Sequence, residues 1–397
     1  MQHSSKELKP QRWLVLAYCF NMDGQAASHH ITDKIPYLKR RGIEPVVVSA
    51  ATGYLDSDVE HHQVTSPAPS GLRFELRHII KLKFGPGIWC RVLRALSAII
   101  LLPFYALEKI FLQLGYGQNV NVGQLMNELN EDTKFLYKDT PERKELVLQD
   151  YSHIVEETWT KTIDYFHKLP KSKVEVRSVP EYSEQNQAGG YYMSPALDGS
   201  RPGVFYANLY DIKQTPTYSM RTLAFHEAIP GHHLQVALNL ENEDLSLYRR
   251  FGYGTSAFSE GWALYAERLS LEIGLAKSPY DELGILQSEL FRAVRLVVDT
   301  GIHFKRWTRE EAMKYMKEIT GMSDTEVTTE IERYIVWPGQ ACSYKVGMLK
   351  ILELREKAKH SLGNSFDIRD FHSAILEHGE PPLFIVEELV NQMIIQK

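Results

Sequence analysis

One short stretch, residues 226–233 (HEAIPGHH), constrains this chain most, because it crowds three imidazoles and a carboxylate around a proline. In an unbroken helix, two imidazoles share a face when they are about one turn apart, at roughly 3.6 residues per turn. Here the next histidines after His226 are His232 and His233. His233 would return to the face of His226, but at roughly 1.5 Å per residue it would lie about 10 Å further along. A regular helix therefore brings neither histidine beside His226.

Proline removes a backbone donor and crowds the preceding turn, whereas glycine accepts unusual dihedral angles. The pair Pro230-Gly231 therefore predicts a bulge that absorbs the two extra residues. With that bulge, His232 reaches the position beside His226, and His233 remains the alternative. Two imidazoles next to a carboxylate that can take a proton from water are what a catalytic zinc site needs, so we predict Zn²⁺ at His226 and His232 with Glu227 as general base. The competing interpretation is that these histidines lie at a helix end and bind no metal.

A third ligand is expected from the helix-like segment 255–267, where Glu260 and Glu267 are seven residues apart and hence share a face. We predict Glu260 as the metal ligand. Glu267 is expected to orient an imidazole by accepting its free N–H, or to be an ordinary surface charge. For Trp262 and Tyr265, core packing is favoured over a substrate role.

For the chain as a whole, the sequence predicts an α+β fold in two domains, 1–115 and 116–397. The predicted boundary is a glycine-containing stretch over residues 115–123. Apolar runs at 13–18 and 46–50, with Gly24 between them, predict the strand, helix and strand of a partial α/β unit. This part resembles the opening of the Rossmann-like domain of two-domain glycosyltransferases over about residues 12–112, although G-x-G-x-x-G is missing and plain architecture is the preferred interpretation. The second domain is expected to be mainly helical, with short strands at 174–179 and 203–209.

The second domain also resembles a bacterial family known only as domain of unknown function number 885, from about residue 110 to 397. The motifs that carry the resemblance are residues 198–203 (DGSRPG), 226–233 (HEAIPGHH), 259–265 (SEGWALY), 299–303 (DTGIH) and 337–340 (WPGQ) with Tyr344. Members look like gluzincin metallopeptidases. The resemblance implies a mainly helical zincin fold, zinc, and hydrolysis of peptide bonds, with the strand Val204 to Leu209, including Asn208, as the edge that binds an extended peptide.

The resemblance also suggests His303 or Tyr344 as the donor to the developing oxyanion. Asp299 is four residues before His303, so the two would share a helix face. Asp299 is expected either to hold the imidazole of His303 or to form a surface ion pair with it. Arg333 and Tyr334 precede a Pro-Gly turn and are predicted to anchor a substrate carboxylate, with a structural role as the alternative.

Family members usually carry a long helical part before the region equivalent to residue 110, which the glycosyltransferase-like fragment replaces here. A fusion or truncated product is therefore expected, and an inactive zinc-binding protein is one alternative function. A glycosyltransferase fragment is another, although its paired glutamates would have seven intervening residues, and Glu260 and Glu267 have six. G-x-S-x-G and P-loop patterns are missing, which argues against serine hydrolases and P-loop enzymes.

Composition narrows the partners and the location. With 45 basic and 50 acidic residues and no charge run, nucleic acid is not expected to bind. Three scattered cysteines and the lack of a signal-peptide core predict a cytoplasmic protein, although family relatives are often exported. The segment Ala95 to Leu107 is too short for the roughly 20 residues of a membrane span, so we expect a buried helix or peripheral membrane contact there. The oligomeric state stays open.

Overall fold

The computed structural model describes residues 11–20, 39–40, 43–52, 60–63, 110 and 122–397 apart from 212, 214 and 253. The chain divides into two compact units, Met1–Tyr105 with Thr300–Thr308, and Ala106–Asp299 with Arg309–Lys397. The domain boundary at 115/116 expected from the sequence stays a prediction. The segment Ala95 to Leu107 lies outside the described residues. Within them, no helix combines the length and the apolar character that crossing a membrane would require.

The first unit contains a three-stranded sheet of β1 (Gln11–Phe20), β2 (Ile43–Thr52) and β3 (Glu60–Gln63). β1 pairs with β2 in parallel, and β2 pairs with β3 in parallel. Parallel strands need a crossover connection, which agrees with the start of an α/β unit expected from the apolar runs. The relation of this sheet to glycosyltransferases stays a prediction.

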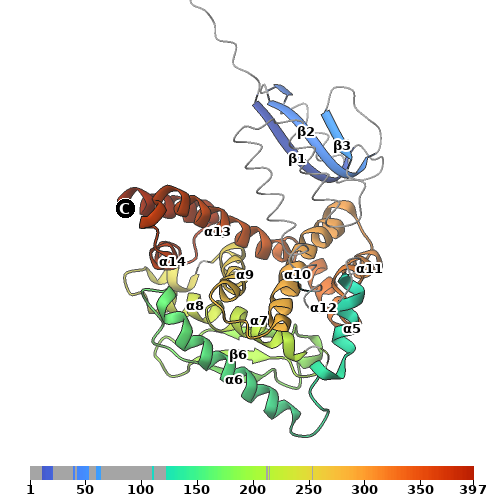
Figure 1. Ribbon diagram of the computed structural model, residues 1–397, viewed down its shortest axis with the longest axis vertical. Helices are drawn as coiled ribbons and strands as arrows, with labels where there is room; N and C mark the ends of the chain where they lie inside the picture. Colours follow the sequence, from blue (N-terminus) through green and yellow to red (C-terminus); the bar gives the residue numbers. More distant parts are fainter. Residues whose placement is uncertain are drawn as a thin grey trace, which may run out of the picture. The chain divides into compact units, whose positions relative to one another are not determined.

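The second unit is mainly helical (Figure 1) and carries a small mixed sheet in the order β4-β6-β5. β4 (Val174–Ser178) is parallel to β6 (Gly203–Ala207), and β5 (Gly190–Met193) is antiparallel to it. β6 is therefore the central strand, so the prediction that residues 204–209 form a sheet edge is wrong. The edge on the side of the site is β5, a four-residue strand that the sequence patterns did not reveal.

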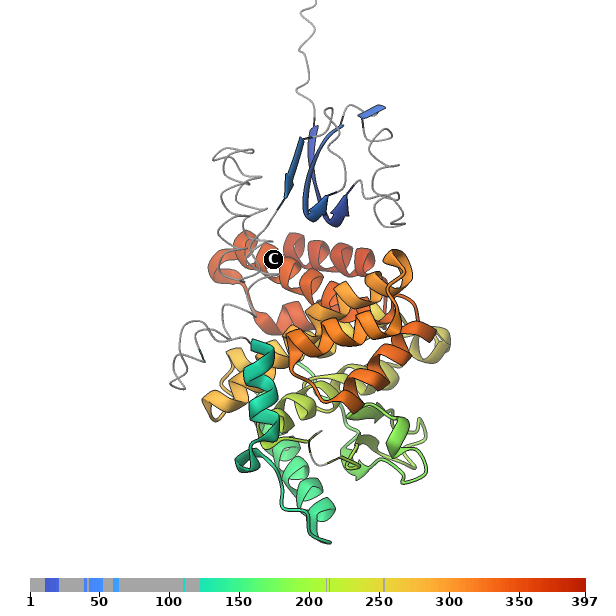
Figure 2. The ribbon, with the colours of Figure 1, turned by 90° about the vertical axis from the view of Figure 1, so that its right-hand side faces the viewer.

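Helices account for most of the second unit. They are α5 (Val122–Glu131), α6 (Arg143–Thr162), α7 (Thr217–Glu227), α8 (His232–Glu241), α9 (Ser256–Glu272), α10 (Pro279–Lys305), α11 (Arg309–Thr320), α12 (Asp324–Val336), α13 (Gln340–Leu362), α14 (Ile368–Leu376) and α15 (Leu383–Gln396). One core cluster joins α6, α7 and the sheet through Tyr151, Phe205 and Ala224. A second joins α9 to the C-terminal helices through Trp262, Met348 and Phe371. The C-terminal helices, in red, lie together in Figure 2.

Two glycines set how closely α9 and α13 approach. A Cβ on Gly261 would come within 2.5 Å of the Gly347 Cα, and a Cβ on Gly347 would come within 1.9 Å of the Ala257 carbonyl oxygen. Both distances are far below van der Waals contact, so side chains larger than hydrogen would push the helices apart. α9 carries Glu260 and α13 carries Tyr344, and this crossing therefore sets the spacing of two residues of the candidate site.

Candidate metal centre

The helix through HEAIPGHH is broken, as the sequence predicted, but the break is larger than a bulge. α7 ends at Glu227 and α8 begins at His232, with a cis peptide bond between Ile229 and Pro230. A Cβ on Gly231 would lie 1.9 Å from the His226 carbonyl oxygen, so only glycine fits this turn. Trp262 donates from Nε1 to the carbonyl oxygen of Pro230 at 2.9 Å and holds the connection from the α9 side.

The break brings together the three residues that the sequence selected as metal ligands. The Glu260 Oε2 atom lies 3.3 Å from His232 Nε2 and 3.6 Å from His226 Nε2. One donor atom from each residue lies within 4.8 Å of the others. The two imidazole rings are perpendicular, with centroids 4.8 Å apart. Two nitrogens and one oxygen thus converge from three different helices.

The charges of this cluster favour a cation at its centre. Glu260 Oε2 is buried and has no hydrogen-bond partner among the residues that the structure describes. Burial works to raise the pKa of Glu260, but His226 and His232 outweigh it and hold the pKa well below its usual value. Burial lowers the pKa of His226, yet Glu260 and Glu267 raise it to about 9. A divalent cation would be bound by the nitrogen and oxygen atoms that converge here, and a set of two imidazoles and one carboxylate suits zinc with one position open.

Glu267 makes the contact predicted for it. Its Oε1 accepts a hydrogen bond from His226 Nδ1 at 2.7 Å, and the two side chains are 1% and 3% exposed. Because Nδ1 donates to this carboxylate, Nε2 of His226 is the nitrogen that faces Glu260 and His232. Such a partner fixes the tautomer and the orientation of a ligand imidazole.

The alternative ligand, His233, lies outside the cluster. Its Nε2 donates to the Ser172 carbonyl oxygen at 2.9 Å, and its Nδ1 accepts from the Tyr192 hydroxyl at 3.0 Å. The side chain is fully buried, and burial lowers its pKa to about 4. Both ring nitrogens of His233 are occupied, and the side chain links β5 to the segment just before β4. Of the two histidines, His232 is therefore the candidate ligand.

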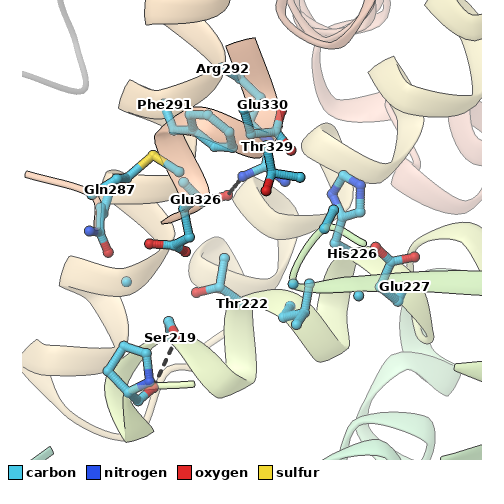
Figure 3. A pocket seen from close by; sticks show the side chains of 18 of the residues that line it. Ser219, Thr222, His226, Glu227, Gln287, Phe291, Arg292, Glu326, Thr329 and Glu330 are labelled. Atoms are coloured by element: carbon cyan, nitrogen blue, oxygen red, sulfur yellow. Dashed lines mark hydrogen bonds between the residues drawn. The ribbon is translucent and has the colours of Figure 1, made fainter. Parts of the chain in front are cut away.

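Glu227 is the last residue of α7 and lines two hollows that meet beside His226. Figure 3 shows His226 and Glu227 next to each other on the wall of the inner hollow. Only 6% of Glu227 is exposed. The position next to the first imidazole and open to both hollows is the one that a proton acceptor for water at this site requires.

Tyr344 and Arg333 line the same two hollows as Glu227. The Tyr344 ring stacks on His226, with centroids 6.0 Å apart and planes at 16°. Arg333 donates to the Tyr344 hydroxyl at 3.1 Å and to Gln340 Oε1 at 3.0 Å, and Gln340 donates to Glu260 Oε1 at 3.3 Å. A chain of hydrogen bonds therefore joins the tyrosine to the carboxylate. Gln340 is the last residue of the motif 337–340, and the sequence did not predict its contact with Glu260.

Two residues predicted to bind substrate are instead buried supports. Asn208 is fully buried, and its Nδ2 donates to the carbonyl oxygens of Glu184 and Gln187 at 2.8 and 2.9 Å. Tyr334 is 1% exposed, and its hydroxyl accepts from Arg295 Nε at 2.7 Å. Neither side chain lines the hollows, so each shapes a wall rather than facing a ligand.

His303 lies in the last turn of α10, within the segment Thr300–Thr308 that groups with the first unit, and its role stays a prediction. Asp299, expected to hold His303, accepts the backbone N–H of Gly339 with both oxygens, at 3.1 and 3.0 Å. That contact supports the start of α13. Trp262 and Tyr265 are both fully buried, which confirms the core-packing interpretation.

Comparison with known proteins agrees with the resemblance seen in the sequence. Residues 105–390 match the family described as bacterial protein of unknown function (DUF885). The chain belongs to this family. No curated protein matches.

Two solved structures are similar to this member of the family. One, from Colwellia psychrerythraea and described as a "putative lipoprotein", shares 42% identity with a TM-score of 0.72, covering 82% of this chain and 53% of the other. The second, described as a "putative lipoprotein of unknown function" from Shewanella oneidensis, shares 23% identity with a TM-score of 0.60, covering 80% of this chain and 56% of the other. The chain therefore spans about half the length of both proteins.

Proposed function

We propose that this protein is a zinc-dependent peptidase in which His226, His232 and Glu260 hold the metal. The supporting observation is the convergence of their donor atoms within 4.8 Å around a buried carboxylate oxygen that lacks a hydrogen-bond partner in the described residues. Zinc bound by such a set polarises a carbonyl group and lowers the pKa of water.

The other residues have roles that follow from their positions. Glu227 takes a proton from the attacking water and returns it to the leaving amine. Glu267 keeps His226 in the tautomer that presents Nε2 to the cluster. Tyr344, whose ring stacks on His226, and Arg333, which donates to the Tyr344 hydroxyl, stabilise the oxygen that becomes negative as the carbonyl is attacked.

A peptide would bind along β5. β5 is an outer strand of its sheet, and Gly190, Tyr191 and Tyr192 line the hollow that also contains His232 and Glu260. An extended segment can add to such an edge through main-chain hydrogen bonds, with alternate side chains entering the hollow. This arrangement replaces the edge that the sequence had assigned to residues 204–209.

The lipoprotein description of both structural neighbours gives the expected cytoplasmic location no support. We propose that the protein acts outside the cytoplasm, on peptides that are present there. Fractionation of cells that produce the full-length protein, with detection by antibody, tests this location.

The activity is tested by comparing the parent protein with Glu227→Gln, which should keep the metal and remove the base. Zinc is measured by mass spectrometry of the purified proteins, and cleavage is measured on a mixed peptide library with and without a chelator. Glu181→Gln makes the same change at an exposed residue and serves as the matched control. We expect stoichiometric zinc in all three proteins and cleavage only in the parent and the control.

Other results decide between the remaining functions. Zinc without cleavage by any of the proteins would favour an inactive zinc-binding protein. Binding of a nucleotide sugar without zinc would favour the glycosyltransferase alternative. Absence of zinc from the parent after purification with added zinc would refute the proposal.

A further inference from the structure

The inner hollow beside the candidate metal centre continues past His226 and Glu227 between α7, α10 and α12. Its far wall is formed by Thr222, Gln287 and Glu326, which Figure 3 shows on the side away from Glu227. Polar and charged groups therefore line a space that adjoins the reacting atoms of the proposed peptidase. Their charge balance indicates which ligand the space accepts.

Cationic side chains in this lining contact carboxylates of the protein, and two of them, Arg295 and Arg333, share Glu330. The pairs are Arg295 with Glu330 at 2.7 Å, Arg333 with Glu330 at 3.6 Å, Arg292 with Glu267 at 3.9 Å, and Lys213 with Glu131 at 2.6 Å. Each of these cations therefore already has a carboxylate of the protein within 3.9 Å.

Glu326 has no such compensation. Its Oε2 accepts hydrogen bonds from the Ser323 backbone N–H at 3.1 Å and hydroxyl at 2.9 Å, which form the capping box of α12. Among the described residues, no lysine or arginine contacts this carboxylate. Burial raises its pKa to about 7 against the effect of the Ser323 hydrogen bonds, and the nearby acids Asp211 and Glu330 add to the rise. A cationic group next to this buried carboxylate would stabilise its charged form.

Thr222 provides a second polar group on the same wall. It is 4% exposed, and within the described part of the chain its Oγ1 has no hydrogen-bond partner. A buried hydroxyl without a partner is costly unless a ligand or water satisfies it. The lining also contains Phe291, an apolar group that can contact the stem of a long side chain. Its ring centroid also lies 4.3 Å from the Arg295 guanidinium carbon and 4.9 Å from that of Arg292.

We propose that the inner hollow binds a basic side chain of the substrate, lysine or arginine, at a residue next to the scissile bond. Glu326 pairs with the ammonium or guanidinium group, and Phe291 contacts the aliphatic stem. This inference rests on the proposed peptidase function and assigns the substrate class of the same site. Peptides with basic residues are thus the preferred substrates.

The sharpest variant is Glu326→Gln, because glutamine also fits the capping box and removes only the charge. Asp324→Asn makes the same charge change in the first turn of α12 and is the matched control. The three proteins are compared on peptide pairs that differ only in lysine or norleucine next to the cleavage site, which mass spectrometry identifies. Since a site built to pair with a charged group rejects the analogue that lacks it, we expect the parent and the control to prefer lysine by about thirtyfold in kcat/KM. In Glu326→Gln the preference should fall to about threefold or less.

A binding measurement separates this inference from the peptidase proposal. Calorimetry with the lysine and norleucine peptides is performed on Glu227→Gln and on Glu227→Gln with Glu326→Gln. Only the first protein should bind the lysine peptide about tenfold more tightly than the norleucine peptide. Cleavage without a preference for lysine, or a preference that survives in Glu326→Gln, would overturn the basic pocket and leave the peptidase standing. Glu326-dependent binding without cleavage would keep the pocket and count against the peptidase.

Discussion

Replacing Glu267 by glutamine removes the charge that orients His226 and leaves the metal ligands themselves unchanged. The carboxylate and the imidazole are joined by a hydrogen bond of 2.7 Å, and both are almost fully buried. Glutamine is similar in size and can still accept the Nδ1 proton through its amide oxygen. The change therefore isolates the contribution of the negative charge to zinc affinity.

The size of the effect follows from this geometry. Loss of an outer partner of a ligand imidazole lowers metal affinity by roughly 10- to 100-fold, or about 1.4 to 2.7 kcal/mol. Glu267→Gln should lie near the lower limit because the hydrogen bond is retained. Glu267→Ala should lie near the upper limit because it leaves the Nδ1 proton buried without an acceptor.

Zinc affinity is measured by competition with a chromophoric chelator. Glu272→Gln is the matched control, because it removes the charge of another carboxylate on α9. The Glu272 carboxylate pairs with Arg355 at 2.8 Å, away from the cluster. The parent and this control should agree within a factor of two. Equal affinities for the parent, Glu267→Gln and Glu267→Ala would show that His226 is not a ligand oriented by Glu267, and the assignment of the centre would fail with it.

Two further changes test the helix break and the tyrosine that stacks on His226. Gly231→Ala places a Cβ 1.9 Å from the His226 carbonyl oxygen, so the backbone must shift; we expect a loss of about 3 kcal/mol in unfolding free energy by urea denaturation, together with weaker zinc binding. A stability equal to that of the parent would contradict the described turn. Tyr344→Phe keeps the ring that stacks on His226 and removes the hydroxyl next to Arg333. We expect unchanged zinc content and a kcat about 100-fold lower on a cleaved peptide, whereas an unchanged kcat would exclude the hydroxyl from stabilising the oxyanion.

The sequence was most informative where local chemistry determines the structure. Pro230-Gly231 located the interruption of the helix, and the seven-residue spacing of Glu260 and Glu267 placed both carboxylates on the face of α9 that meets His226. The sequence did not reveal that this interruption is a full break rather than the predicted bulge. A bulge and a full break between two helices both satisfy proline and glycine, and the contact from Trp262 that supports the break comes from a distant part of the chain.

Roles that depend on burial could not be read from the sequence. Asn208 and Tyr334 carry polar groups that can bind a ligand, but the fold directs those groups toward carbonyl oxygens and Arg295. β5 was missed because a four-residue strand that begins with the second of two consecutive glycines gives too short a pattern. Glu326 reads as an ordinary capping-box residue, and only the packing of α12 against α7 and α10 turns its carboxylate toward a hollow.

The glycine contact between α9 and α13 limits how this cleft can diversify. Glu260 directly precedes Gly261, and Tyr344 lies one helical turn before Gly347, so a bulkier residue at either glycine would displace a group of the centre. A change of substrate preference has to be made elsewhere. The tolerant positions are on β5 and on the walls formed by α10 and α12, and a library that randomises those positions with both glycines retained would alter specificity while preserving the geometry around the metal.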